Sequence, residues 1–200
     1  MSRIMCVYCG VASATTSDHV PPKQLLLKPY RPNLRTVPSC SACNEELSLD
    51  EEYFRLVVVG LFCHGSEADA VFDEPMTRSF ERRPQLEERM WASLGAEGGR
   101  PFVQIDTTRF IRVVTKIIRG LHFDRYKSFL PLEVPVKVQF FTSENLPQAV
   151  IRAFEKTGYD IIDSPSFAYS VKEDDPAYSH IWHLVFFGEW HCIAGYEIHQ

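Results

Sequence analysis

Four cysteines near the start of the chain are spaced as the ligands of a metal ion are. Cys6 and Cys9 form one pair, Cys40 and Cys43 form a second, and 30 residues separate the pairs. A two-residue gap lets both thiolates of a pair turn toward one point, so two pairs supply the four sulfurs of a tetrahedral site. We therefore predict a structural zinc ion bound by these four residues. The alternatives are two unrelated turns with buried free cysteines, or a redox dithiol.

Polar residues between and after the pairs could carry phosphodiester chemistry. Hydrolysis needs an activated water, and a histidine such as His19, which titrates near neutrality, can remove its proton. The Asp18 carboxylate and the Asn44 amide oxygen are hard ligands of the kind that Mg²⁺ or Mn²⁺ prefers. Adjacent residues of an extended segment point to opposite sides, so Asp18 and His19 can serve the metal and the water separately. Asn33 would fix the loop or the imidazole by hydrogen bonds.

This combination resembles the HNH nuclease family. The similarity is to members whose ββα-metal (treble-clef) motif is built around a four-cysteine zinc site, such as the phage junction-resolving nucleases of the endonuclease VII type, and it covers residues 6–48. The resemblance implies that Asp18 is a metal ligand and His19 the catalytic histidine. It also implies that Asn33 is the central asparagine and that Asn44, at the last motif position, is the second ligand of the catalytic metal. The implied activity is that of a divalent-metal-dependent DNA endonuclease.

A second hypothesis is a zinc-dependent module that binds nucleic acid or protein without cleaving it. Acidic residues follow the second cysteine pair at Glu45, Glu46 and 50–52, and carboxylates near a phosphate site repel the substrate unless they face away. Taken singly, Asp18 and His19 could also be a turn cap and a hydrogen-bond donor in a tight loop.

The charge of the chain is divided unequally along its length. The whole protein carries 21 Lys and Arg against 26 Asp and Glu, a formal net charge of −5. Residues 1–44 have a net charge of +4 and the remainder −9, and Asp18 is the single acid in the first segment. Because phosphate binding relies on cationic surface, a basic N-terminal segment favours a DNA partner. The candidate phosphate contacts in this segment are Lys23, Lys28, Arg31 and Arg35.

The sequence gives no sign of export or of a membrane span. The N-terminus lacks an apolar stretch of about 7 to 15 residues typical of a signal peptide. The longest apolar run, residues 56–63, is far shorter than the roughly 20 residues that cross a bilayer. We therefore expect a cytoplasmic protein, in which Cys63 and Cys192 are buried thiols rather than disulfide partners. The oligomeric state stays open.

Periodicity along the rest of the chain predicts an α+β fold. Helices are expected over residues 48–62, 84–94, 107–123 and 147–156, and strands over 132–142, 167–171, 181–187 and 191–198. Pro135 places the first of these strands at a sheet edge. We predict a small zinc-stabilised ββα-metal (HNH) module over residues 1–50. A larger α+β body with a C-terminal antiparallel sheet, of unknown role, follows over residues 51–200.

Basic residues follow one face of the helix predicted over 107–123. Their positions are three or four apart, and they are Arg109, Arg112, Lys116 and Arg119. Such a stripe could follow a DNA backbone, and the alternative is a solvated helix face.

Overall fold

The N-terminal part of the chain folds as a β-hairpin followed by a helix. The computed structural model describes residues 4–29, 34–97, 100–173 and 175–198. Strand β1 (Thr16–His19) pairs antiparallel with β2 (Thr36–Ser39), and the short 3-10 helix η1 (Lys23–Leu25) lies in the connection between them. Cys40 alone separates β2 from helix α1 (Ser41–Glu46). The second cysteine pair is therefore placed at the start of a helix that directly follows the hairpin.

Two longer helices form the middle of the protein. Helix α2 (Ser48–Val57) continues as a π-helical turn, η2 (Val58–Phe62), and together they span the helix predicted over 48–62. Helix α5 (Thr107–Tyr126) is capped by Asp106, whose carboxylate accepts hydrogen bonds from two backbone N–H groups of the first turn. The apolar residues of α5 that recur at helical spacing are all buried, and they are Phe110, Val113, Val114, Ile117, Ile118 and Leu121.

The C-terminal part is a five-stranded antiparallel sheet, which confirms the predicted α+β class and C-terminal sheet. Its strands are β5 (Lys137–Thr142), β6 (Asp160–Asp163), β7 (Phe167–Glu173), β8 (His180–Phe186) and β9 (Trp190–Tyr196). Their order is β5-β9-β8-β7-β6. Strand β5 is an edge strand, as Pro135 predicts, but it begins at Lys137, after the proline. Strand β6 was absent from the sequence prediction, because four residues are too few to establish an alternating pattern.

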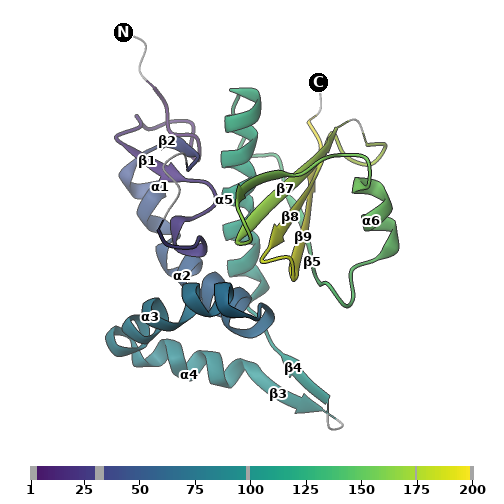
Figure 1. The fold of residues 1–200 in the computed structure, drawn as a ribbon. Coiled ribbons are helices and arrows are strands. Elements are labelled where there is room, and N and C mark those ends of the chain that lie inside the picture. Colours follow the sequence, from purple (N-terminus) through teal and green to yellow (C-terminus); the bar gives the residue numbers. More distant parts are fainter. Residues whose placement is uncertain (1–3, 30–33, 98–99, 174, 199–200) are drawn as a thin grey trace.

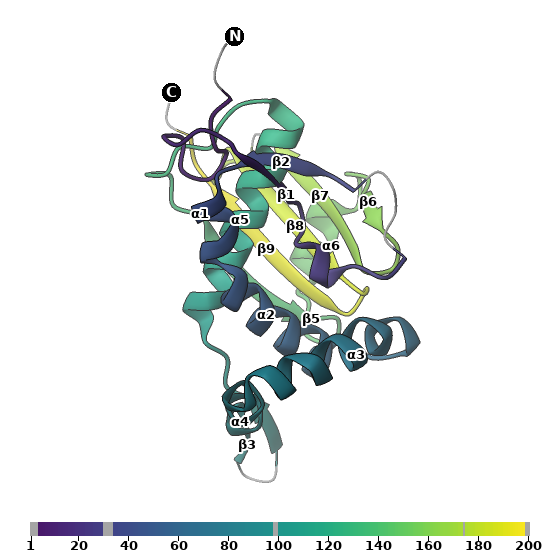
Figure 2. The ribbon, with the colours of Figure 1, turned by 90° about the vertical axis from the view of Figure 1, so that its left-hand side faces the viewer.

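Helix α5 stands between the N-terminal hairpin and one face of the sheet, and helix α6 (Gln148–Phe154) lies on the other face (Figures 1 and 2). Aromatic contacts fix α5 on the sheet: the Phe110 ring centroid lies 5.6 Å from that of Phe140 and 5.8 Å from that of Trp190. On the far face, Phe154 of α6 lies 5.2 Å from His183 of β8. Both faces of the sheet are thus covered by a helix.

An arm of two helices and a hairpin extends away from the sheet (Figure 1). It consists of α3 (Ser66–Arg82), α4 (Pro84–Ser93), and strands β3 (Leu94–Glu97) and β4 (Arg100–Val103), which pair with each other. Helix α4 begins at Pro84 as predicted, whereas α3 was not predicted. Pro75 interrupts the helical pattern in its sequence, because proline removes an N–H donor and clashes with the preceding turn. A small cluster of Leu56, Met76, Leu86 and Met90 holds the arm to α2.

The two segments predicted from the sequence share one hydrophobic core. The division at residue 50 falls inside α2, and the same core contains Cys6 and Val37 from the hairpin segment and Trp182 and Tyr196 from the sheet. The division into residues 1–50 and 51–200 stays a prediction. Cys63 and Cys192 are buried free thiols, as predicted. Within the described ranges, no helix has the length and apolar character that crossing a bilayer requires.

Candidate metal centre and its polar neighbours

The four cysteines of the two pairs come together in space. One sulfur from each of Cys6, Cys9, Cys40 and Cys43 lies within 4.8 Å of the others, and we call these residues the cysteine cluster. A tetrahedron of sulfurs bound to zinc at 2.3 Å has edges of about 3.8 Å. The cluster is therefore of the right size and composition to hold a metal ion such as zinc.

Local backbone structure aims each pair at the same point. In the first pair, the Gly10 N–H donates to the Cys6 carbonyl at 2.9 Å, and Gly10 has a φ of +66°, a conformation that glycine adopts without strain. In the second pair, Cys40 caps helix α1, and its sulfur accepts a hydrogen bond from the Cys43 N–H at 3.5 Å. The Val7 N–H donates to the Pro38 carbonyl at 2.9 Å and so joins the two pairs.

Backbone hydrogen bonds favour the ionised form of one thiol in the cysteine cluster. Burial opposes ionisation of Cys6, but backbone N–H groups of Cys40, Cys9 and Tyr8 lower the pKa of its thiol to about 6. Burial and the neighbouring sulfurs raise the pKa of the Cys43 thiol. Four thiolates repel one another without a cation among them, so a bound zinc ion would supply the charge that this arrangement needs.

Asp18 and His19 lie on opposite sides of strand β1, as the alternation of a strand requires. Asp18 is 8% exposed and faces inward, whereas His19 is half-buried. Burial and the charge of Lys23 lower the pKa of His19, while Asp18 acts in the opposite direction. The imidazole is therefore neutral at neutral pH and able to accept a proton.

The Asp18 carboxylate binds an ammonium group that the sequence analysis did not connect with it. Lys116 Nζ of α5 lies 2.7 Å from Asp18 Oδ2 and 2.7 Å from Glu51 Oε1 of α2. All three residues are less than 10% exposed. Burial opposes the charge of Lys116, but Glu51 and Asp18 raise its pKa, so the ammonium stays charged. Lys116 and Glu51 thus belong to this site. The sequence signal for Lys116 is its spacing: it lies three residues after the apolar, buried Val113 and therefore on the same side of α5.

The two asparagines of the predicted motif differ in what the structure describes. Asn44 follows Cys43 in α1, and its Nδ2 donates to Thr16 Oγ1 of β1 at 3.4 Å, so the side chain spans from helix to strand. Thr16 and Asp18 are two positions apart and therefore share a face of β1. The cysteine cluster thus places Asn44 beside the face that bears Asp18. Asn33 lies outside the described residues.

The four candidate phosphate contacts have different surroundings. Lys23 in η1 and Lys28 are exposed. Arg35 is half-buried: its guanidinium pairs with Asp124, lies 3.9 Å from Asp160 Oδ1, and is 5.6 Å from the centre of the Tyr169 ring. A phosphate would have to compete with these carboxylates for Arg35. Arg31 lies outside the described residues.

The basic residues of α5 are engaged within the protein. Arg109 Nε lies 2.7 Å from Asp50 Oδ1, and Arg112 Nη1 lies 2.9 Å from Asp50 Oδ2. Arg119 donates to the carbonyl oxygens of residues 130, 131 and 132. Arg112 stays half-exposed, whereas Lys116 and Arg119 are buried, so a solvated helix face does not describe the whole set. The acidic start of α2 faces α5 and neutralises part of its charge. The same pairing removes the objection that Asp50 and Glu51 would repel a phosphate.

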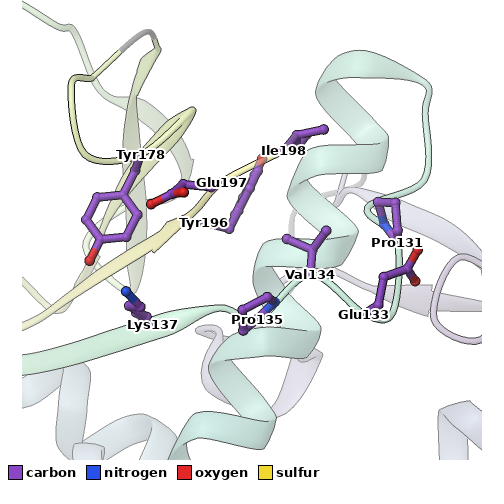
Figure 3. A pocket seen from close by; sticks show the side chains of 9 residues that line it. All are labelled: Pro131, Glu133, Val134, Pro135, Lys137, Tyr178, Tyr196, Glu197 and Ile198. Carbon is purple, nitrogen blue, oxygen red and sulfur yellow. The ribbon is translucent and has the colours of Figure 1, made fainter. Parts of the chain in front are cut away.

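Of two cavities in the described part of the protein, one is lined by predicted site residues and the other is not. A cavity of about 330 Å³ is lined by Pro131, Glu133, Val134, Pro135, Lys137, Tyr178, Tyr196, Glu197 and Ile198, and none of the predicted site residues lines it (Figure 3). A second cavity, of about 380 Å³, lies beside the cysteine cluster and has Cys9, Cys43 and Lys116 in its wall. We take the second as the one relevant to the site, because of its contact with the cluster.

The residues of the two predicted metal sites suit a zinc ion at the cysteine cluster but not Mg²⁺ or Mn²⁺ at Asp18. The cysteine cluster has the soft sulfur ligands and the spacing that suit zinc. A divalent cation at Asp18 does not fit the arrangement in this structure, because the ammonium of Lys116 already lies at hydrogen-bond distance from that carboxylate. We therefore assign no chemical step to Mg²⁺ or Mn²⁺.

Comparison of the chain with family models, with curated proteins and with solved structures found no match in any of the three.

Proposed function

We propose that the protein is an HNH-type endonuclease that hydrolyses DNA phosphodiester bonds, with His19 as the general base. The observation that carries this proposal is the arrangement around the cysteine cluster. An antiparallel hairpin leads directly into a helix, and Asn44 at that helix reaches back to the strand that bears Asp18 and His19. This order of strand, strand and helix supports a ββα-metal module around a structural zinc ion.

The environment of His19 suits a general base. The imidazole is neutral at neutral pH because burial and Lys23 lower its pKa. In the proposed reaction, His19 takes a proton from a water molecule, the hydroxide attacks phosphorus, and the bond between phosphorus and one ester oxygen breaks. The departing oxygen takes a proton from solvent.

Positive charge beside His19 supports binding of a nucleic-acid backbone. Lys23 is exposed and close enough to His19 to affect its pKa, and Lys28 is exposed five residues further along. Exposed ammonium groups bind phosphates through long-range attraction, which salt screens. We therefore propose that these two lysines contact the DNA, and that binding weakens as the salt concentration rises.

One observation favours a second candidate, a zinc-dependent module that binds nucleic acid or protein without hydrolysis. The carboxylate that the HNH resemblance makes a metal ligand is bound to Lys116 instead. If Asp18 serves only to hold α5 against β1, the module would keep its fold and its basic surface but lack a catalytic centre.

A nicking assay on supercoiled plasmid separates the two candidates. The zinc-loaded wild-type protein is compared with His19→Ala and with Ser17→Ala, a matched control because Ser17 is exposed on the same face of β1. We expect His19→Ala to lower the nicking rate roughly 10²- to 10⁴-fold, the usual contribution of a general base, and Ser17→Ala to leave it within about threefold. Zinc content should be equal in all three proteins. If the wild type shifts the plasmid in a gel but leaves it intact under all metal and salt conditions, the binding module is the correct assignment.

A further inference from the structure

The ammonium of Lys116 is enclosed by groups that suit a cation. Two carboxylate oxygens, Asp18 Oδ2 and Glu51 Oε1, each lie 2.7 Å from Nζ, and the ring of Tyr8 is centred 5.2 Å from it. These partners come from three separate segments of the chain. Gln24 Nε2 lies 3.4 Å from the second oxygen of Glu51, so that carboxylate is held from two sides. The contacts define a buried cation position that a side chain of the protein fills.

A divalent metal and this ammonium cannot both occupy that position. Mg²⁺ binds carboxylate oxygens at about 2.0–2.1 Å, so an ion bound to Asp18 on this side would overlap the Lys116 nitrogen. Expelling the ammonium would also leave a charged lysine without its two partners in a buried setting, which is costly. The competition therefore favours the lysine.

The approach from the neighbouring cavity leads to Lys116 first. The cavity of about 380 Å³ beside the cysteine cluster has Lys116 in its wall, together with Arg112 and Arg119, whereas Asp18 and Glu51 do not line it. Glu46 and two cysteines also line this cavity, but a cation that enters it meets Lys116 before it reaches Asp18 or Glu51. Lys116 therefore stands between this cavity and the two carboxylates of the site.

We propose that Lys116 is the resident cation of the site at Asp18, and that the protein binds no Mg²⁺ or Mn²⁺ through this carboxylate. Lys116 is then a positioning residue: it neutralises Asp18 and Glu51 and holds β1, and with it His19, against α5. DNA cleavage by the proposed endonuclease would accordingly proceed without a divalent metal at Asp18. The inference rests on the proposed function only for this last consequence, because the occupant of the site can be measured without any cleavage.

The direct test is a titration of the zinc-loaded protein, residues 1–200, with Mn²⁺, in which electron paramagnetic resonance measures the free Mn²⁺. Wild type and Asp18→Asn are compared, since the variant keeps the shape of the side chain and removes its charge. We expect the two binding curves to coincide. One Mn²⁺ bound per wild-type chain that is lost in Asp18→Asn would overturn the proposal.

Substitution of the lysine gives a second readout, which a merely structural role would not change. Lys116→Met removes the ammonium and keeps the apolar stem, whereas Lys116→Arg keeps a positive charge. Mn²⁺ at 1 mM, on the order of a weak-site dissociation constant, should raise the melting temperature of Lys116→Met and not that of wild type or Lys116→Arg. A shift of equal size in all three proteins would contradict the proposal. If Lys116→Met does not fold, the comparison of wild type with Asp18→Asn still decides.

A plasmid nicking assay without added divalent metal distinguishes failure of this inference from failure of the proposed function. Absence of nicking together with coincident Mn²⁺ curves would reject the endonuclease and support Lys116 as the resident cation. Nicking that requires Mn²⁺ together with Asp18-dependent Mn²⁺ binding would support the endonuclease and reject the role of Lys116.

Discussion

Gly120 of α5 lies directly against Val20, the residue that follows β1. A Cβ placed on Gly120 would be 2.5 Å from Val20 Cγ2 and 3.0 Å from Cγ1, both closer than van der Waals contact allows. Valine is branched at Cβ, which restricts its χ1 rotamers, so the side chain cannot turn aside at low cost. This approach of helix to strand is what brings Lys116, one turn earlier in α5, to Asp18.

The contact predicts that Gly120→Ala destabilises the protein, although alanine is the better helix former by about 1 kcal/mol. Overpacking usually costs roughly 1–3 kcal/mol, so after the gain in helix propensity we expect a net loss of up to about 2 kcal/mol in the free energy of unfolding. Urea denaturation measures it. Val20→Ala in the same chain should recover part of the loss, and Gly158→Ala, where no heavy atom lies within 4 Å of the added carbon, serves as the control. Equal losses of unfolding free energy in Gly120→Ala and Gly158→Ala would show that the contact between Gly120 and Val20 does not limit the packing of α5.

The cysteine cluster predicts a zinc ion that the N-terminal segment needs in order to fold. Cys40→Ser should lose the metal, measured by elemental analysis, and should unfold the segment around the cluster, because zinc binding supplies folding free energy there. Cys63→Ala removes a buried thiol outside the cluster and should keep one zinc per chain. Wild-type protein that contains no zinc after purification in its presence would refute the assignment.

The basic residues of α5 predict unequal losses of stability. Arg119 is 7% exposed and donates to the carbonyl oxygens of residues 130, 131 and 132, of which the Pro131 carbonyl also accepts from the Val134 N–H. Arg119→Met should cost about 1–3 kcal/mol in the free energy of unfolding, since the carbonyl of buried Leu130 is left unsatisfied. Arg112 is half-exposed and makes ion pairs with Asp50 and Glu46, so Arg112→Met should cost about 0–1 kcal/mol. Losses of similar size in the two variants would argue against this division of roles.

The buried histidine pair of the sheet predicts a loss of stability in acid. Tyr159, His183, His191 and Ser143 form a continuous chain of hydrogen bonds across β8 and β9. Burial and the neighbouring His191 lower the pKa of His183 to about 4. Between about pH 6.5 and pH 4 the unfolded state therefore binds more protons than the folded state, and stability falls as the pH falls.

For His183 alone this corresponds to about 2 kcal/mol between pH 7.5 and pH 5. Chemical denaturation at the two pH values should show a smaller difference for His183→Gln than for wild type. His64→Gln, at an exposed histidine, should reproduce the wild-type difference. An unchanged pH difference in His183→Gln would show that His183 does not stay neutral in the folded protein.

Several features of this protein follow from the sequence alone because they depend on local spacing. Two-residue gaps within each cysteine pair were sufficient to predict the cluster, and alternation and helical periodicity were sufficient to predict α5 and the long strands of the C-terminal sheet. The predictions failed where the pattern was short or interrupted, at β6 and at α3. The adjacency of Cys43 and Asn44 also fixes, within one turn of helix, which polar residue lies beside the cluster.

Only the tertiary structure decides what Asp18 contacts. The dipeptide Asp18-His19 establishes which side chains the strand carries, but not that a lysine from α5 and a glutamate from α2 converge on the carboxylate. Those partners depend on how closely α5 approaches β1, which the absence of a side chain at Gly120 permits. Ion pairs between distant segments leave no periodic trace in a sequence, because each partner also occurs commonly on exposed helix faces. Their pairing is determined by the packing of the core, and here it places an ammonium where the sequence predicted a metal.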